Sequence, residues 1–392
     1  KIDLSNTTID PIRLSKILSD LKKQNINNVI MEASSHGLDQ NRLDGLIFNT
    51  GIFTNLSQDH LDYHKNIKDY LKAKLYLFNN LIAKNGNVIT DEEIPEFKKI
   101  KKITINKNLN LCLLNDKKNN FKFLSHNFDG EVQLLKIKHN NLVHNIKLNL
   151  IGKIQLKNIL MAIIAAKKSN IEIKKIFKVI PRIKSVEGRF ERIGMIKNRS
   201  KVILDYAHTP DALSTWLKNL KERFPNHKSN IGFGCGGDRD QGKRAKMGRI
   251  ADIFSDKIYL TDDNPRLELP SKIRKDIKKG IRKQKILEFT NRTKAISEAI
   301  SQLNTGEILL VAGKGHETVQ EIGVKKVFFS DKKNILSAIK KKNLSLSDNL
   351  KVNIINELSK KKRKLSKIYF NQAKINSKEI NKDDIFFAIK GK

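Results

Sequence analysis

The sequence predicts an α/β fold made of two consecutive domains, each built on a parallel sheet. Short apolar runs alternate with amphipathic helical segments, which is the pattern of strand–helix–strand units. The chain has 392 residues, which is more than one domain with a single hydrophobic core usually contains. The alternation of strand-like and helical segments also restarts after a break at Pro181–Arg192. We therefore expect a first domain over residues 1–185 and a second over 186–340.

In the first domain, the periodicity predicts a helix over Leu14–Lys23 and then a buried parallel strand over Val29–Ala33. A second strand is expected at Ile47–Thr54, because a short apolar run is again bounded by polar residues. An amphipathic helix over Tyr70–Leu81 and a strand over Gly86–Asp91 continue the series.

A small β-rich subdomain is expected between Ile103 and Leu150. Short alternating runs are separated there by Asp129-Gly130 and Asn140-Asn141, which are dipeptides typical of hairpin turns. A helix over Gln155–Ser169 follows this subdomain.

The second domain contains short apolar runs that are each expected to form a strand of one sheet: Lys201–Asp205, Ile231–Cys235, Lys257–Thr261 and Ile308–Ala312. After Lys340 the chain becomes rich in Lys, Asn and Ser, so we expect a linker over residues 341–365. A fresh apolar run at Ile385–Ile389 predicts that a further domain begins within residues 366–392.

The chain is strongly basic, with 77 Lys and Arg against 41 Asp and Glu and a formal net charge of +36. Clustered cations would suit nucleic acid, but these lysines are scattered, so we expect solvated faces and no nucleic-acid partner. We see no apolar run long enough to cross a bilayer and no secretory signal, which predicts a cytoplasmic protein without membrane insertion. Cys112 and Cys235 are expected to be free thiols.

Three motifs in the first domain combine residues that could carry chemistry. Met31–Leu38 places Glu32 and two hydroxyls just past a predicted strand end, where a carboxylate can hold a metal beside phosphate oxygens or simply end the strand. Thr54–His64 gathers histidines and carboxylates that suit metal or substrate contacts, or a helix N-terminus. Lys74 lies on an apolar helical face, where a lysine is more often snorkelling than functional.

Polar clusters also follow the predicted strands of the second domain: Asp205–Asp211, Gly234–Asp240, Asp262–Arg266 and Gly313–Glu317. Each is weak by itself. Because the carboxyl ends of parallel strands meet at one edge of a sheet, we expect three polar clusters at successive strand ends to converge on one crevice.

Taken in order, the motifs resemble the Mur ligase family, MurE type, from Asn6 to about Ala338. The matching segments are Asn6–Thr8, Glu32–Leu38, Thr54–His64, Ala73–Phe78, Glu187–Glu191, Asp205–Asp211, Gly234–Asp240, Asp262–Arg266 and Gly313–Glu317. The resemblance implies a central ATPase domain, with a parallel sheet and a small β subdomain, followed by a Rossmann-like C-terminal ligase domain. It also implies ATP-dependent addition of meso-diaminopimelate to a UDP-muramoyl dipeptide through an acyl phosphate, in cell-wall synthesis.

The resemblance further implies a role for particular residues. The UDP-muramoyl dipeptide would be held by Thr7, Thr8, Ser34, Gln40 and Arg42. Magnesium ions would be served by Glu32 and a carbamylated Lys74, with His60 close by as a further catalytic residue. ATP would contact Asn158, Arg189, Asp205, Tyr206 and His208. Diaminopimelate would contact Arg239, Asn264, Arg266, Gly313 and Glu317.

The sequence departs from the family pattern in three places. It contains no Gly-x-x-x-x-Gly-Lys-Ser/Thr phosphate-binding loop, so we expect a fragment that lacks this loop and the UDP-binding domain. Gln155 stands where the family usually has asparagine. Ile375–Gly391 resembles the opening of a MurF-type N-terminal domain, which predicts a second ligase fused behind the first.

Two other functions are consistent with the sequence. A folylpolyglutamate-synthetase-like ligase shares the fold and the acyl-phosphate chemistry, but its amino-acid pocket should not carry Asp263-Asn264-Pro265-Arg266. A non-catalytic basic binding protein on a ligase scaffold would fit the net charge of +36 and the missing loop. A salt-dependent titration with nucleic acid would separate the binding protein from the enzyme.

Overall fold

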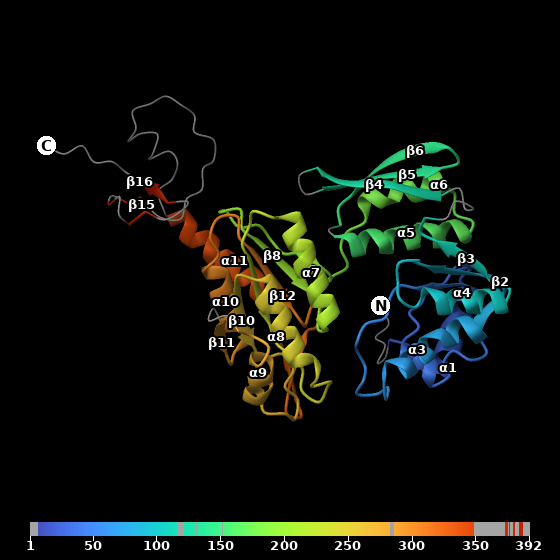
Figure 1. Cartoon of the computed structure of the whole chain (residues 1–392), viewed down its shortest axis with the longest axis horizontal. Coiled ribbons are helices and arrows are strands. Elements are labelled where there is room, and N and C mark those ends of the chain that lie inside the picture. Colours follow the sequence, from blue (N-terminus) through green and yellow to red (C-terminus); the bar gives the residue numbers. More distant parts are fainter. Residues whose placement is uncertain are drawn as a thin grey trace. The chain divides into compact units, whose positions relative to one another are not determined.

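The computed structural model describes residues 7–115, 121–129, 132–150, 152–282, 286–348, 373–374, 376, 379–380 and 384–386. The chain forms two compact units, Lys1–Lys184 and Ser185–Lys392 (Figure 1). Most of the expected linker at 341–365 and of the expected further domain at 366–392 lies outside the described residues.

A short parallel sheet organises the first unit. Its strands are β1 (Phe48–Phe53), β2 (Ile82–Thr90) and β3 (Asn110–Leu113), in the order β1-β2-β3. The strands predicted at Ile47–Thr54 and Gly86–Asp91 are thus confirmed. Phe53 of β1 and Val88 of β2 are buried in a core with side chains of the neighbouring helices.

The strand predicted at Val29–Ala33 is wrong. This segment pairs with no strand among the described residues, and Ile30 is 98% exposed. An apolar run becomes a buried parallel strand only where neighbouring strands bond its backbone and helices cover its faces. Val29 and Ile30 lack that cover, so the run joins no sheet among the described residues.

The helices of the first unit begin where the sequence provides caps. Asp10, Ser34 and Asn66 each accept a backbone N–H of the following turn, and Pro11 occupies the first helical position. The helices are α1 (Pro11–Lys23), α2 (Ser35–Asp39), α3 (Ile67–Tyr76) with its π-helical continuation (Leu77–Leu81), α4 (Phe97–Asn106), α5 (Lys153–Lys168), α6 (Ile173–Val179) and a 3-10 turn (Ile180–Arg182).

The predicted β-rich subdomain is an antiparallel three-stranded sheet. It contains β4 (Phe121–Asp129), β5 (Val132–His139) and β6 (Leu142–Leu148). The predicted Asn140-Asn141 turn joins β5 to β6 with φ angles of 47° and 65°, as a type I′ turn requires. Apolar side chains of this sheet pack on α5, which closes one core.

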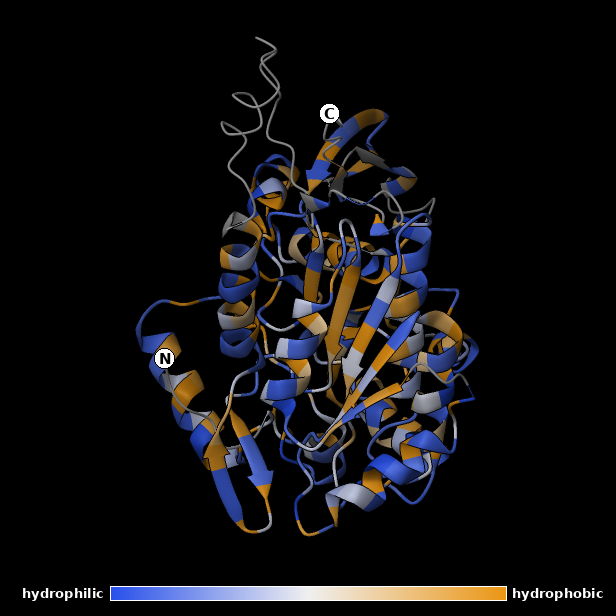
Figure 2. Cartoon of the chain, turned by 90° about the vertical axis from the view of Figure 1, so that its left-hand side faces the viewer, coloured by the Kyte–Doolittle hydropathy of each residue, from blue (hydrophilic) through white to orange (hydrophobic). Residues whose placement is uncertain are grey.

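The second unit is built on a six-stranded sheet in the order β11-β10-β9-β12-β8-β7. All pairs are parallel except the edge pair of β7 with β8, and apolar residues run along the strands (Figure 2). The strands are β7 (Glu191–Arg192), β8 (Lys201–Asp205), β9 (Ser229–Phe233), β10 (Lys257–Thr261), β11 (Ile286–Phe289) and β12 (Ile308–Ala312). The predicted strands are confirmed, and β7 and β11 are additions.

Helices α7 (Pro210–Arg223), α8 (Lys243–Phe254), α9 (Pro270–Lys278), α10 (Arg292–Ser301) and α11 (Asp331–Asp348) complete the second unit. A hairpin of β13 (Val319–Ile322) and β14 (Lys325–Phe328) precedes α11. Strands β15 (Ala373–Lys374) and β16 (Ile385–Phe386) pair in parallel. The α/β class predicted from the sequence is confirmed.

Helix α11 continues to Asp348, so the first part of the expected linker is helical instead. Tertiary contacts explain the difference. Asn343 accepts the Lys197 N–H at 2.9 Å and donates to the Met195 carbonyl at 2.9 Å, and Lys342 donates to the Ser301 carbonyl at 2.6 Å. Polar composition alone does not reveal such contacts.

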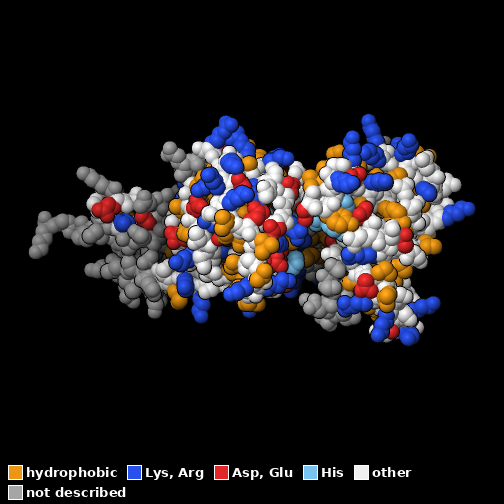
Figure 3. Space-filling view, turned by 90° about the horizontal axis from the view of Figure 1, so that it is seen from below, with side chains coloured by type: hydrophobic (Ala, Val, Ile, Leu, Met, Phe, Trp, Pro, Cys, Tyr) orange, Lys and Arg blue, Asp and Glu red, His pale blue; other side chains and the backbone are white. Residues whose placement is uncertain are grey.

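Two further predictions concern the whole described chain. Cys112 and Cys235 form no disulfide, as expected, and both are buried. Within the described residues, no helix combines the length and apolarity needed to cross a bilayer. Lys and Arg side chains are scattered among other types on the face shown in Figure 3.

Candidate functional site

In the first unit, Thr8 organises a small hydrogen-bond network. Its buried hydroxyl donates to the Glu32 carbonyl at 2.9 Å and accepts the Ser34 N–H at 2.9 Å. Arg42 donates to the Thr8 carbonyl at 2.7 Å and to the side chain of Gln40. The structure therefore brings together four of the residues predicted to hold the dipeptide, with Thr7 exposed beside them.

Lys74 lies in the last turn of α3, with its ammonium 5.1 Å from the centre of the Tyr70 ring. Burial lowers the pKa of Lys74, while the charges of Asp59, Glu32 and Glu96 oppose that shift. A lowered pKa raises the fraction of neutral amine, which is the form that reacts with CO₂ to give a carbamate. The predicted carbamylation therefore has a physical basis here.

Glu32 was predicted to hold magnesium together with Lys74, and His60 was predicted as a further catalytic residue. Glu32 is exposed and near enough to affect Lys74 electrostatically, and the His60 ring lies 5.9 Å from the Tyr70 ring. In the described parts of the chain, no group of three or more His, Cys, Asp and Glu side chains could hold a metal by itself. Magnesium usually keeps several waters and takes one or two carboxylates plus phosphate oxygens, so Glu32 with a carbamylated Lys74 fits that requirement.

The structure brings His36 next to the two histidines of the Thr54–His64 motif, a proximity that the sequence did not predict. The His36 ring lies 5.0 Å from the His60 ring and 5.5 Å from the His64 ring. His64 is buried, stacks on Tyr70 and contacts the Ser35 hydroxyl at 3.0 Å. Burial lowers the pKa of both His36 and His64, which favours their neutral forms.

In the second unit, Asp205 ends β8 as a buried carboxylate. It accepts the backbone N–H groups of Phe190 and Ala207, both at 2.7 Å. Burial raises the pKa of Asp205 to about 6, although these hydrogen bonds favour the charged form. This carboxylate thereby joins the loop before β7 to the loop that follows β8.

Arg189, Tyr206 and His208, all predicted to bind ATP, lie next to Asp205. The Arg189 guanidinium is 4.3 Å from the centre of the Tyr206 ring, and His208 Nδ1 is 2.8 Å from the Tyr206 carbonyl oxygen. An aromatic ring and a guanidinium plane at one place suit stacking on a nucleotide base. Asn158 belongs to the first unit, where it is exposed on α5.

The Arg189 loop requires glycine at position 188. Gly188 has φ +65°, and a Cβ there would lie 2.2 Å from the backbone nitrogen of His316. The loop before β7 therefore touches the loop after β12 through backbone atoms. This contact joins two motifs that are far apart in the sequence.

The predicted convergence of polar clusters is observed around Glu317. Tyr206 donates to Glu317 Oε1 at 3.2 Å, and Asn264 donates to Glu317 Oε2 at 3.0 Å. Lys314 is fully buried and donates to Asn264 Oδ1 and to Glu317 Oε2, both at 2.8 Å. Burial raises the pKa of Tyr206 to about 12, so its hydroxyl keeps its proton and remains a donor.

Arg266 and Arg239 lie beside the glycine-rich turn after β9. Arg266 Nε is 2.7 Å from Glu321 Oε2, and Arg266 Nη1 donates to the Gly237 carbonyl at 2.9 Å. A Cβ on Gly236 would lie 3.0 Å from Arg266 Nη1 and 3.7 Å from Arg239 Cγ. The remaining residue predicted for diaminopimelate, Gly313, donates its N–H to the Asp205 carbonyl at 3.2 Å.

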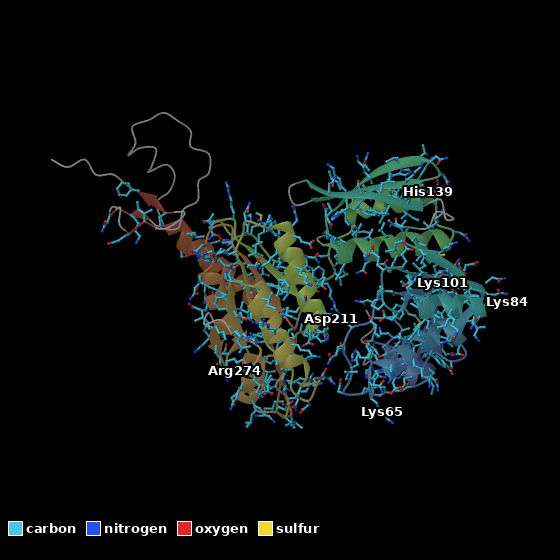
Figure 4. All side chains as sticks on the ribbon, viewed as in Figure 1. Lys65, Lys84, Lys101, His139, Asp211 and Arg274 are labelled. Atoms are coloured by element: carbon cyan, nitrogen blue, oxygen red, sulfur yellow. The ribbon has the colours of Figure 1, made fainter. Side chains whose placement is uncertain are left out.

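A neighbouring ion pair supports this edge of the sheet. Arg274 on α9 (Figure 4) forms ion pairs with Asp262 and, at 2.8 Å, with Glu288.

Lys314 and Glu321 belong to the site but were not singled out from the sequence. Lys314 stands inside a recognised motif, whereas Glu321 lies in a hairpin that the sequence analysis did not identify.

Models of two domain families match the chain: the Mur ligase middle domain over residues 3–166 and the Mur ligase glutamate ligase domain over residues 188–315. The UDP-N-acetylmuramoyl-L-alanyl-D-glutamate–2,6-diaminopimelate ligase of Rickettsia montanensis is 39% identical over 335 residues, which are 85% of this chain and 69% of that protein. The ligase of the same name from Chelativorans sp. (strain BNC1) is 36% identical over 336 residues, 86% of this chain and 69% of that protein.

Solved structures give the same picture. A structure of a UDP-N-acetylmuramoyl-L-alanyl-D-glutamate–2,6-diaminopimelate ligase matches with a TM-score of 0.57 and 31% identity, covering 85% of this chain and 68% of the other. A Mycobacterium tuberculosis folylpolyglutamate synthase has a TM-score of 0.55 at 16% identity, over 68% of this chain and 61% of the other. At that identity the second match concerns the fold alone.

Proposed function

The chain belongs to the Mur ligase family, MurE type, and we propose that it serves the ATP-dependent addition of meso-diaminopimelate to UDP-N-acetylmuramoyl-L-alanyl-D-glutamate in peptidoglycan synthesis. The observation that carries the proposal is the convergence of Asn264, Lys314 and Glu317 beside Arg266. Together these side chains offer an amide, a carboxylate and a guanidinium, which are the groups needed to bind the ammonium and carboxylate of an amino acid.

The reaction proceeds in two transfers. The γ-phosphoryl group of ATP passes to an oxygen of the D-glutamate carboxylate, and ADP leaves. The amine of the acceptor then attacks the acyl carbon, phosphate leaves with the C–O bond electrons, and the amine loses a proton. In this proposal Thr8, Ser34 and Arg42 orient the dipeptide, so that positioning lowers the barrier of both transfers.

Nucleotide binding is assigned to the loop beside Asp205. The Arg189–Tyr206 pair would stack on the base, and His208 adds a side chain at the start of α7. Magnesium would be held by Glu32 and carbamylated Lys74, and when bound it would neutralise charge at the transferring phosphoryl group. His60, whose ring lies 5.9 Å from that of Tyr70, would assist as a further catalytic residue.

The acceptor is assigned to the crevice around Glu317. Arg266 and Arg239 would bind carboxylates, while Glu317 and Asn264 would bind an ammonium group, with the Gly313 backbone beside them. Lysine carries no distal carboxylate, so Arg266 favours diaminopimelate. The Asp263–Arg266 segment and the relatives' names both favour this acceptor over a folylpolyglutamate-type ligase or a non-catalytic binding protein.

Two further parts of the proposal concern context. We place the reaction in the cytoplasm, because it consumes ATP. A fused MurF-type ligase that begins within residues 366–392 stays a prediction, since the structure describes only a few residues of that segment.

Acceptor choice tests the proposed function. The complete natural polypeptide that carries this chain is assayed for ADP release with meso-diaminopimelate, L-lysine or L-glutamate as acceptor. We expect kcat/KM to be highest with diaminopimelate, and Arg266→Lys to raise its KM about tenfold or more while the KM for ATP stays unchanged. Preference for lysine or glutamate in the unmodified enzyme would refute the substrate assignment.

A further inference from the structure

We infer that Glu321 competes with the distal carboxylate of the acceptor for the guanidinium of Arg266, and so limits how tightly the site binds a dicarboxylate amino acid. The inference rests on the proposed function, because it assumes that Arg266 binds an acceptor carboxylate. It adds a residue of the β13–β14 hairpin to the determinants of acceptor affinity.

The hairpin first fixes the backbone of Arg266. This residue has φ +50°, in the left-handed region that costs free energy for any residue with a Cβ. Its N–H donates to the Glu321 carbonyl at 3.1 Å, and its own carbonyl accepts the Gly323 N–H at 2.8 Å. Both flanks of the strained residue are therefore bonded to the same hairpin, which holds Arg266 in that conformation.

Glu321 then engages the side chain of Arg266. A planar guanidinium offers two edges for a two-pronged contact with a carboxylate, Nε with Nη2 and Nη1 with Nη2. Glu321 Oε2 is 2.7 Å from Nε, and the Gly237 carbonyl accepts from Nη1 at 2.9 Å. A substrate carboxylate must displace Glu321 from the first edge or, at the second edge, lie close to its negative charge.

The position of Glu321 makes an exchange of partners feasible. Its backbone N–H donates to Asn264 Oδ1 at 3.0 Å, so the residue stays anchored beside the acceptor crevice whatever its side chain does. Its carboxylate is 29% exposed and lies 3.8 Å from the ammonium of Lys326, which is 74% exposed. When an acceptor carboxylate takes Arg266, the Glu321 carboxylate can turn to Lys326 without losing every cation partner.

The exchange affects acceptors differently. Diaminopimelate brings a distal carboxylate and has to break the Arg266–Glu321 pair before it gains its own contact. L-Lysine brings none and leaves the pair intact. Removing the charge of Glu321 should therefore tighten the binding of diaminopimelate and leave that of lysine unchanged.

The test measures binding to the 392-residue chain without relying on turnover. The chain is labelled with ¹⁵N-arginine, the Nε–H signal of Arg266 is assigned with Arg266→Lys, and meso-diaminopimelate or L-lysine is titrated while arginine signals are followed. We expect Glu321→Gln to lower the Kd for diaminopimelate about tenfold, because a neutral amide lacks the Coulombic attraction with which a carboxylate holds the guanidinium. Lys325→Gln, which removes an exposed charge from the same hairpin, should change neither Kd.

The outcomes separate the inference from the function on which it rests. An equal or higher Kd for diaminopimelate in Glu321→Gln overturns the inference alone, and Glu321 would then orient Arg266 for its ligand. If diaminopimelate shifts the Arg266 signal in neither protein, the acceptor assignment fails together with the inference. An equal gain in lysine affinity also overturns it, since a general increase in affinity would not depend on the distal carboxylate.

Discussion

Among single residues, Asp205 shows how burial and hydrogen bonding oppose each other at one carboxylate. Two backbone N–H groups stabilise its charged form, yet burial dominates and raises its pKa to about 6. Its partner Phe190 stacks on Trp216 with ring centres 4.0 Å apart. Because Trp216 is the only tryptophan in the sequence, its fluorescence reports on the surroundings of Asp205 in the second unit.

Asp205 should therefore make the stability of the second unit depend on pH. The folded protein binds the proton of the Asp205 carboxyl more tightly than the unfolded chain does. The contribution of this group to the stability of the folded state is therefore greatest below about pH 4 and is lost as pH rises through about 6. The quantity to measure is the difference in free energy of unfolding between the unmodified chain and Asp205→Asn, obtained from urea titrations followed by Trp216 fluorescence. We expect this difference to fall by roughly 2 kcal/mol between pH 4 and pH 7.

The control for this experiment is Asp211→Asn, which removes an exposed carboxylate from the first turn of α7 (Figure 4). The prediction fails if Asp205→Asn and the unmodified chain show parallel pH profiles, because Asp205 would then titrate alike in the folded and unfolded states.

At the scale of elements, the ends of helices and strands depend on their neighbours. Val29–Ala33 has the composition of a buried strand but pairs with no strand in the described part of the chain. The polar end of α11, in contrast, is helical to Asp348 because other segments of the second unit bind it. Asn343 makes two of these contacts, to backbone groups of Met195 and Lys197.

We expect Asn343→Ala to lower the free energy of unfolding of the second unit by about 1 to 3 kcal/mol. The substitution removes two hydrogen bonds of roughly 0.5–1.5 kcal/mol each, while alanine keeps a high helix propensity. Urea unfolding followed by Trp216 fluorescence gives the value, with Lys341→Ala, at an exposed position of the same helix, as control. An equal effect of both substitutions would mean that helix propensity, and not the Asn343 contacts, determines the stability of this end.

At the scale of the whole molecule, the charge and the missing loop bear on what these residues can do. The sequence spans 69% of its Rickettsia montanensis relative and contains no Gly-x-x-x-x-Gly-Lys-Ser/Thr segment. Backbone N–H groups of such a loop normally surround the phosphates of the nucleotide, and a net charge of +36 spread over the surface does not replace them.

We therefore expect a protein consisting of residues 1–392 to show no magnesium-dependent hydrolysis of ATP and no ligation. Phosphate release measured with saturating ATP, dipeptide precursor and diaminopimelate tests this, with the complete Rickettsia montanensis ligase as the positive control. Turnover above the rate without enzyme would show that another segment of this chain binds the phosphates.

The sequence by itself determined the α/β class, the strands β8, β9, β10 and β12 of the six-stranded sheet, and the motifs at their carboxyl ends, because each depends on local periodicity or on a short run of residues. It also indicated that Asn264 and Glu317 would meet, since parallel strands end at one edge. Only the tertiary structure decided that Lys314 is buried between them, that Gly188 touches His316, and that Glu321 holds Arg266. These contacts join residues that are distant in the chain, and their strength comes from burial and hydrogen-bond geometry, which exist only after the loops have packed together.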